Sequence, residues 1–170
     1  MEEIWNLTDT HDFVDAMTSL VLKKAGIDDN EIDLSALNEA ERVFMMTHTT
    51  SMLLCDGGFA LLFTTYFLYH YKYVPSELVK AYTAIGATDI ADECQKVFRA
   101  VFGEKMPDNI DALHEFLDEF DIDTLDGDAE TIFVECNERF FASYIDEDYE
   151  LNAIYALSYN YITKNEQYFK

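Results

Sequence analysis

The stretch that decides the fold class is PSELVKAYTAIGATDIADECQKVFRAVF, residues 75–102. Pro75 suits the first turn of a helix, where its missing N–H leaves no hydrogen bond unmade. Apolar residues then follow at helical spacing: Val79, Tyr82 and Ile85. Gly86 ends this pattern, so the first half of the stretch predicts one amphipathic helix.

The second half of the stretch predicts another helix. Thr88 or Asp89 is placed to cap its start, and the turn residues at 103–107 end it. Its apolar positions also have helical spacing: Ile90, Ala91, Cys94, Val97, Phe98 and Val101. Two adjacent amphipathic helices, with no strand-like alternation elsewhere in the chain, indicate an all-α fold.

The flanking sequence carries more helical patterns. The first predicted helix has a Thr10 cap and ends before Gly26, and the second opens at Ser35 and stops at Asp56-Gly57-Gly58. Further helices are predicted at about 59–71, 109–120, 128–144 and 148–163. We therefore predict a single compact all-α domain over residues 1–170, with about seven or eight helices and no internal repeat.

The composition limits the classes of partner. Thirty-four acidic residues stand against 11 Lys and Arg, a formal net charge of −23. Hydrophobic residues still make up 49% of the chain and aromatic residues 15%, which favours a folded core over disorder. Direct nucleic-acid binding is disfavoured because the phosphates would be repelled. The partners left are basic proteins, cations or none.

The sequence also bears on location. The N-terminus has no basic region followed by an apolar run, so a secretory signal is not predicted. The longest uncharged run, residues 57–71, is too short to span a bilayer. The three cysteines are far apart and odd in number, unlike a disulfide framework: Cys55, Cys94 and Cys136. We expect a cytoplasmic protein with no membrane contact.

Charge is concentrated in the acidic segment, which we define as residues 108–130. It holds ten acidic residues and no Lys or Arg. If it were one helix, it would carry one carboxylate per about 3.5 Å, close to the roughly 3.4 Å per phosphate of a DNA strand. Carboxylates can accept from arginine as phosphates do. The alternative is that the acidity serves only solubility.

Catalytic and metal-binding patterns are weak. An EF-hand register starting at Glu119 fails at Thr124, where a glycine is needed for the sharp turn, so at most loose cation binding is expected. The histidines have no metal-binding spacing: His11, His48, His70 and His114. We predict no catalytic residues, no metal site and no cofactor. A divalent-metal-dependent hydrolase is kept as an alternative.

Two short motifs resemble a known family, built around a bacterial DNA-mimic protein. The first is Asp56-Gly57-Gly58-Phe59 with Phe63, and the second is Ile85-Gly86-Ala87. The chain departs from the family pattern at Asp56, Leu61, Leu62 and Thr65. The retained residues have a structural role in our interpretation: glycines permit tight turns, and phenylalanines four apart share one helix face.

The resemblance implies an all-α protein whose acidic surface imitates DNA and occupies the DNA-binding face of a basic protein. That partner is a transcription regulator or, in an immunity-type alternative, a nuclease toxin. A homodimer is compatible with the sequence. The predicted partner-binding residues are Asp118, Glu119, Asp121, Asp123, Asp126, Asp128 and Glu130. A secondary group comprises Asp146, Glu147 and Asp148.

Overall fold

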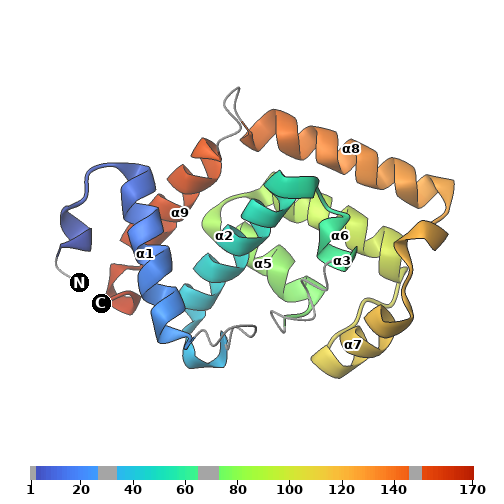
Figure 1. The fold of residues 1–170 in the computed structure, drawn as a ribbon, viewed down its shortest axis with the longest axis horizontal. Coiled ribbons are helices and arrows are strands. Elements are labelled where there is room, and N and C mark those ends of the chain that lie inside the picture. Colours follow the sequence, from blue (N-terminus) through green and yellow to red (C-terminus); the bar gives the residue numbers. More distant parts are fainter. Residues whose placement is uncertain (1–2, 27–33, 65–72, 146–150) are drawn as a thin grey trace.

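A computed structural model describes residues 3–26, 34–64, 73–145 and 151–170. Within these residues the chain forms eight α-helices, four short 3-10 turns and no strand, which confirms the all-α prediction. Figure 1 shows that the helices pack in several orientations, with α1 and α9 at one end of the long axis and α7 at the other. None of the helices described is both long enough and apolar enough to cross a membrane.

The helices α5 (Pro75–Ile85) and α6 (Thr88–Phe102) form the central pair. Pro75 occupies the first turn of α5, and Gly86 ends it in the left-handed region with φ of 92°. Ala87, which is fully buried, takes the position before α6. The prediction that Thr88 or Asp89 is the N-cap of α6 is wrong, because Ala87 occupies that position; Asp89 lies in the first turn, where its Oδ1 accepts a hydrogen bond from the N–H of Ile90 at 3.1 Å.

The longest helix, α2 (Glu39–Gly57), contacts α1 (Thr10–Lys24), α3 (Leu61–Thr64), α5 and α9 (Asn152–Lys164). Ser35 does not open it; Ser35 lies in the preceding turn η2 (Leu34–Ala36). Asn38 caps α2 instead, since Asn38 and Glu41 exchange hydrogen bonds between side chain and backbone. Likewise Asp9, not Thr10, caps α1.

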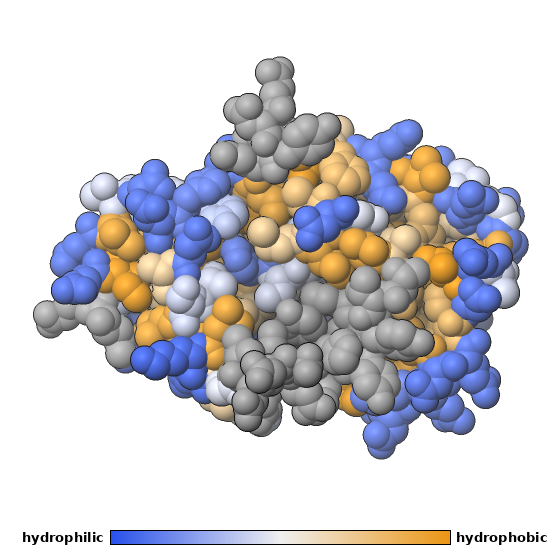
Figure 2. All heavy atoms as spheres, viewed as in Figure 1, coloured by the Kyte–Doolittle hydropathy of each residue, from blue (hydrophilic) through white to orange (hydrophobic). Residues whose placement is uncertain are grey.

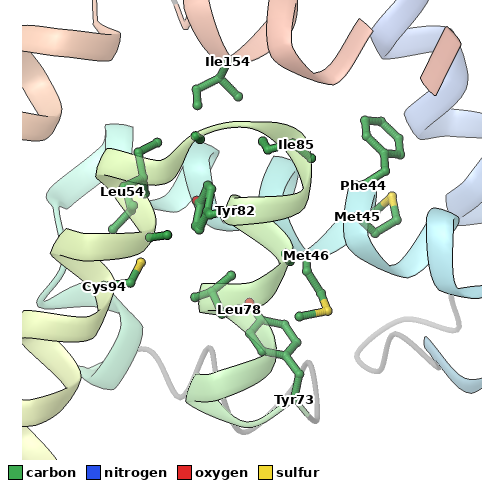
Figure 3. Close-up of a cluster of buried hydrophobic side chains, with 14 of the residues drawn as sticks. Phe44, Met45, Met46, Leu54, Tyr73, Leu78, Tyr82, Ile85, Cys94 and Ile154 are labelled. Atoms are coloured by element: carbon green, nitrogen blue, oxygen red, sulfur yellow. The ribbon is translucent and has the colours of Figure 1, made fainter. Parts of the chain in front are cut away.

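Figure 3 shows part of the core between α2, α5 and α6. Tyr82 is fully buried there, near Leu54 and Cys94, and its hydroxyl is 2.9 Å from Ser51 Oγ. Tyr73 Oη in turn lies 2.8 Å from Thr50 Oγ1. Both buried phenols therefore have hydrogen-bond partners, as burial requires.

The remaining helices follow the predicted order. They are α7 (Ile110–Glu119), the turn η3 (Ile122–Thr124) and α8 (Gly127–Tyr144), which packs on α6. The turns η1 (Ile4–Asn6) and η4 (Glu166–Tyr168) lie near the two chain ends. Of the third predicted helix, residues 61–64 form α3 and residues 59–60 lie in the turn before it. Residues 65–71, like residues 148–150 of the last predicted helix, lie outside the described residues.

The first glycine motif joins α2 to α3 and also holds α8. Gly58 has φ of 73°, and the backbone N–H of Phe59 donates to Asn137 Oδ1 on α8 at 2.8 Å. Phe59 lies in the turn before α3 and contacts Phe140, while Phe63 lies within α3. The two phenylalanines are buried but do not share a helix face, which corrects the sequence interpretation.

Candidate functional site

The acidic segment folds into helix, loop and helix at the end of the molecule farthest from the two termini (Figure 1). All seven of its predicted partner-binding residues are exposed: Asp118, Glu119, Asp121, Asp123, Asp126, Asp128 and Glu130. Figure 2 shows hydrophilic side chains along this edge of the molecule. The secondary group at 146–148 lies outside the described residues.

One face of α7 is apolar and the other is acidic. Leu113 and Leu117 are buried, and Phe116 contacts Phe102 with ring centroids 4.7 Å apart. The opposite face carries carboxylates at i, i+4, i+7 and i+8: Asp111, Glu115, Asp118 and Glu119. Residues at these spacings are neighbours on a helix surface. The fold therefore converts a run of acidic residues into a solvent-facing stripe.

These charges oppose the stability of α7. Like charges at i, i+4 destabilise a helix by about 0.2–0.5 kcal/mol per pair, and Glu115 makes such pairs with Asp111 and Glu119. Asp118 and Glu119 also lie in the last turn, where the negative end of the helix dipole repels them, and that turn has no basic residue. The stripe is therefore not explained by helix formation.

Two acidic residues of the loop do have local structural roles. Asp121 accepts a hydrogen bond from the N–H of Asp123 at 3.0 Å, and Asp126 accepts one from Ala129 at 2.8 Å as the cap of α8. Asp128 and Glu130 follow in the first turn of α8, where the helix dipole favours them. The carboxylates of Asp121 and Asp126 are thus fixed in position by the backbone.

The ion pairs between described residues all lie outside the acidic segment. The ion pairs between described residues join Lys24 to Glu41, Arg42 to Glu77, Lys96 to Glu93, Arg139 to Glu93 and Glu135, and Lys170 to Glu166. No carboxylate of the acidic segment pairs with a described lysine or arginine. Its carboxylates are therefore available to an external cationic partner.

The acidic surface continues along α8 beyond the segment defined from sequence. Glu135 and Glu138 are exposed, as is Val134, which is 51% exposed between them and Glu130. Within the described ranges, the ion pair of Glu135 is a long contact of 3.4 Å with Arg139. The base-free run itself continues to Glu138, but residues 131–134 carry no carboxylate and interrupt the dense acidic run at Glu130. The helical spacing of Asp128, Glu135 and Glu138 is the signal that would have extended it.

Buried contacts fix α8 to the rest of the fold. Arg139 donates to Glu93 on α6 at 2.8 Å, and Glu93 is only 8% exposed. Burial acts to raise the pKa of Glu93, but hydrogen bonds from Arg139, Cys136 and Lys96 outweigh it and lower the pKa to about 2. Tyr144 also donates to Asp89. Helix α8 is thus held by charged and polar contacts as well as by its apolar face.

A protein-family model described as DMP19-like protein matches residues 35–165. The chain belongs to the DMP19-like protein family. The match covers most of the chain, from η2 to the turn after α9, and includes the acidic segment and both glycine motifs. Searches of curated proteins and of solved structures gave no match.

Metal binding and cysteine-based catalysis have little support in the part of this DMP19-like protein that the structure describes. No group of three or more His, Cys, Asp or Glu side chains there is arranged to hold a metal ion. Burial raises the pKa of the Cys94 thiol, and burial with Glu93 nearby raises the pKa of Cys136 to about 12. These two thiols stay protonated near neutral pH and are poor nucleophiles.

Proposed function

We propose that this DMP19-like protein is a non-catalytic binding protein whose acidic segment occupies the DNA-binding surface of a basic DNA-binding protein. Membership in the DMP19-like family is consistent with a DNA-mimic protein. One observation supports the proposal most strongly. The carboxylates of α7 are exposed and unpaired with described bases, and those of Glu115, Asp118 and Glu119 lie where they destabilise their own helix.

The same carboxylates suit a partner that binds phosphate. Arginine grips a carboxylate through two parallel N–H bonds, as it grips a phosphate. A net charge of −23 would also steer a basic partner toward the protein and make association fast and salt-sensitive. Solubility alone needs no concentration of charge in one segment, whereas a DNA-like surface does.

The test compares two variants of equal charge. The first neutralises Asp118, Glu119, Asp128 and Glu130 to the matching amides, leaving the loop caps Asp121 and Asp126 in place. The control neutralises four exposed acids from other parts of the fold: Glu3, Asp12, Asp56 and Asp92. Each is used to capture partners from the native host at low salt, with and without competing DNA.

The first variant should capture at least tenfold less partner than the native chain, and the control should capture nearly as much as the native chain. Competing DNA should release the partner, because both occupy the same surface. An equal loss of capture in the two variants would show that binding depends on the net charge and not on the acidic segment. A captured partner that binds DNA without cutting it indicates a regulator, and one that cleaves DNA indicates the immunity-type alternative.

A further inference from the structure

A groove between α2 and α5 lies away from the acidic segment. Its volume is about 570 Å³, within the range of roughly 300–1,000 Å³ typical of small-molecule sites. Apolar residues line it from both helices, among them Val43, Met46 and Ala81. Met46 is labelled in Figure 3 at the boundary between α2 and α5. Ala81 and Met46 are buried at the base of the groove, and Val43 and Ala84 supply the more exposed part of its apolar lining.

Charges of both signs surround this apolar lining. Glu39 and Arg42 come from α2, and Glu77 and Lys80 come from α5. Arg42 Nη2 and Glu77 Oε1 are 3.2 Å apart, and both side chains are more than a third exposed. Lys80 and Glu39 are exposed, and neither forms an ion pair with a described residue. The groove therefore offers a cationic and an anionic contact beside an apolar surface.

Arg42 has a donor that no described residue uses. Its Nε is buried without a hydrogen-bond partner in the described part of the chain, and its ion pair with Glu77 is long. Buried polar atoms without partners are uncommon in folded proteins and call for an explanation. A carboxylate that enters the groove would give the guanidinium a stronger acceptor after a small rotation, since arginine binds carboxylates through two donors at once.

We propose that the groove binds an apolar zwitterion, with its carboxylate at Arg42 and Lys80, its ammonium at Glu39, and its side chain on the apolar lining. A simple anion would be repelled by the net charge of −23, and a simple cation would leave the two bases unmatched. A net-neutral zwitterion meets neither penalty. Free apolar amino acids and short apolar peptides share this chemistry.

Isothermal titration calorimetry of the whole chain tests the proposal with four probes. L-phenylalanine and the dipeptide L-leucyl-L-phenylalanine carry both charges and distinguish the two sources. 3-Phenylpropionate lacks the ammonium, and 2-phenylethylamine lacks the carboxylate. At least one zwitterion should bind at least tenfold more tightly than either single-charge analogue.

Two substitutions assign the ends of the ligand. Arg42→Met should lower the affinity for the zwitterion and for 3-phenylpropionate at least fivefold and leave the affinity for 2-phenylethylamine unchanged. Glu39→Gln should lower the affinity for the zwitterion and leave that for 3-phenylpropionate unchanged. Lys23→Gln, an exposed change on α1, should alter none of them. Circular dichroism establishes that each variant is folded.

Three outcomes overturn the proposal. The first is the absence of saturable binding by either zwitterion at millimolar concentration. The second is binding that neither Arg42→Met nor Glu39→Gln changes. The third is preferential binding of an amphipathic helical peptide in the groove, which would make it a protein-docking surface. None of these results depends on capture by the acidic segment.

Discussion

Gly58 has the least freedom to change of the glycines in this chain. Its φ of 73° is unfavourable for other residues, and a Cβ built there would lie 2.4 Å from Asn137 Oδ1. We expect Gly58→Ala to lower the free energy of unfolding by about 2–4 kcal/mol, from backbone strain and overlap together. Urea unfolding followed by circular dichroism measures this loss.

Two other glycines separate these causes. Gly103 has φ of 67° but an added Cβ meets nothing within 4 Å, so Gly103→Ala should cost only the strain, about 1–2 kcal/mol. Gly127 has neither feature, and Gly127→Ala should be neutral or slightly stabilising. If all three substitutions cost the same, contact with Asn137 is not what selects glycine at 58.

His48 links stability to pH. It is 7% exposed, packs against Phe44 and Tyr155, and its Nδ1 has no hydrogen-bond partner among the described residues. Burial lowers the pKa of His48, and the nearby charge of Asp15 offsets this only in part. Because the unfolded state then binds the proton more tightly, stability is full above the ordinary histidine pKa near 6.5 and falls as the pH drops through it.

We therefore expect the urea midpoint of the native chain to decrease as the pH is lowered from 7.5 to 5.5. In His48→Leu the decrease should be smaller, since the buried titrating group is gone. His11, which is stacked on Tyr155 and only partly buried, provides a matched comparison through His11→Leu. An identical pH dependence in the native chain and in His48→Leu would contradict this assignment.

At the scale of the element, α7 carries charges that its own dipole opposes. Asp118→Asn with Glu119→Gln removes two negative charges from the last turn and two like-charge neighbours of Glu115. The pair should raise the free energy of unfolding by about 0.5–1.5 kcal/mol at low salt. Differential scanning calorimetry in 20 mM buffer should show a higher Tm.

The first turns of α7 and α8 give the control for this prediction. Asp111→Asn with Asp128→Asn removes the same charge from helix N-termini, where it is favourable. If the helix dipole is responsible, this double substitution should raise the free energy of unfolding less than the Asp118 and Glu119 substitutions do, or should lower it. Equal gains in the two pairs would show that only the net charge matters.

At the scale of the whole molecule, a net charge of −23 destabilises the compact state through self-repulsion. The ion pairs among the described residues are mostly half-exposed and worth little each. Raising NaCl from 10 to 300 mM should therefore raise the urea midpoint. The same ionic strength from MgCl₂ should act similarly or somewhat more strongly, without saturating at micromolar metal. Saturation there would instead favour the divalent-metal alternative.

The sequence predicts much of this architecture where one residue dictates the local backbone. Pro75 begins a helix, and Gly86 and Gly103 follow helix ends, as expected from proline geometry and from the freedom of glycine at positive φ. Caps are harder to place, because several polar residues compete at each start. Asn38 caps α2 through Glu41, a pairing that the order Asn-x-x-Glu signals but that Ser35 obscured.

Of the candidate site too, the sequence predicts one part and not another. Exposure of the acidic segment follows from its composition, since unpaired carboxylates are rarely buried. Its extension to Glu135 and Glu138 requires knowing which face of α8 is buried. The groove between α2 and α5 arises from how two helices cross, and no local pattern in residues 39–46 or 77–84 encodes that crossing.

The lone tryptophan makes the two ends of the molecule separately observable. Trp5 contacts Phe13, and Lys170 Nζ lies 5.4 Å from its ring centroid, at the end opposite α7 (Figure 1). Its fluorescence should therefore report on unfolding of the α1 end and stay unchanged when a ligand covers the acidic segment. Emission from Trp5 can thus follow the integrity of the fold without a label during a titration with a ligand that contains no tryptophan.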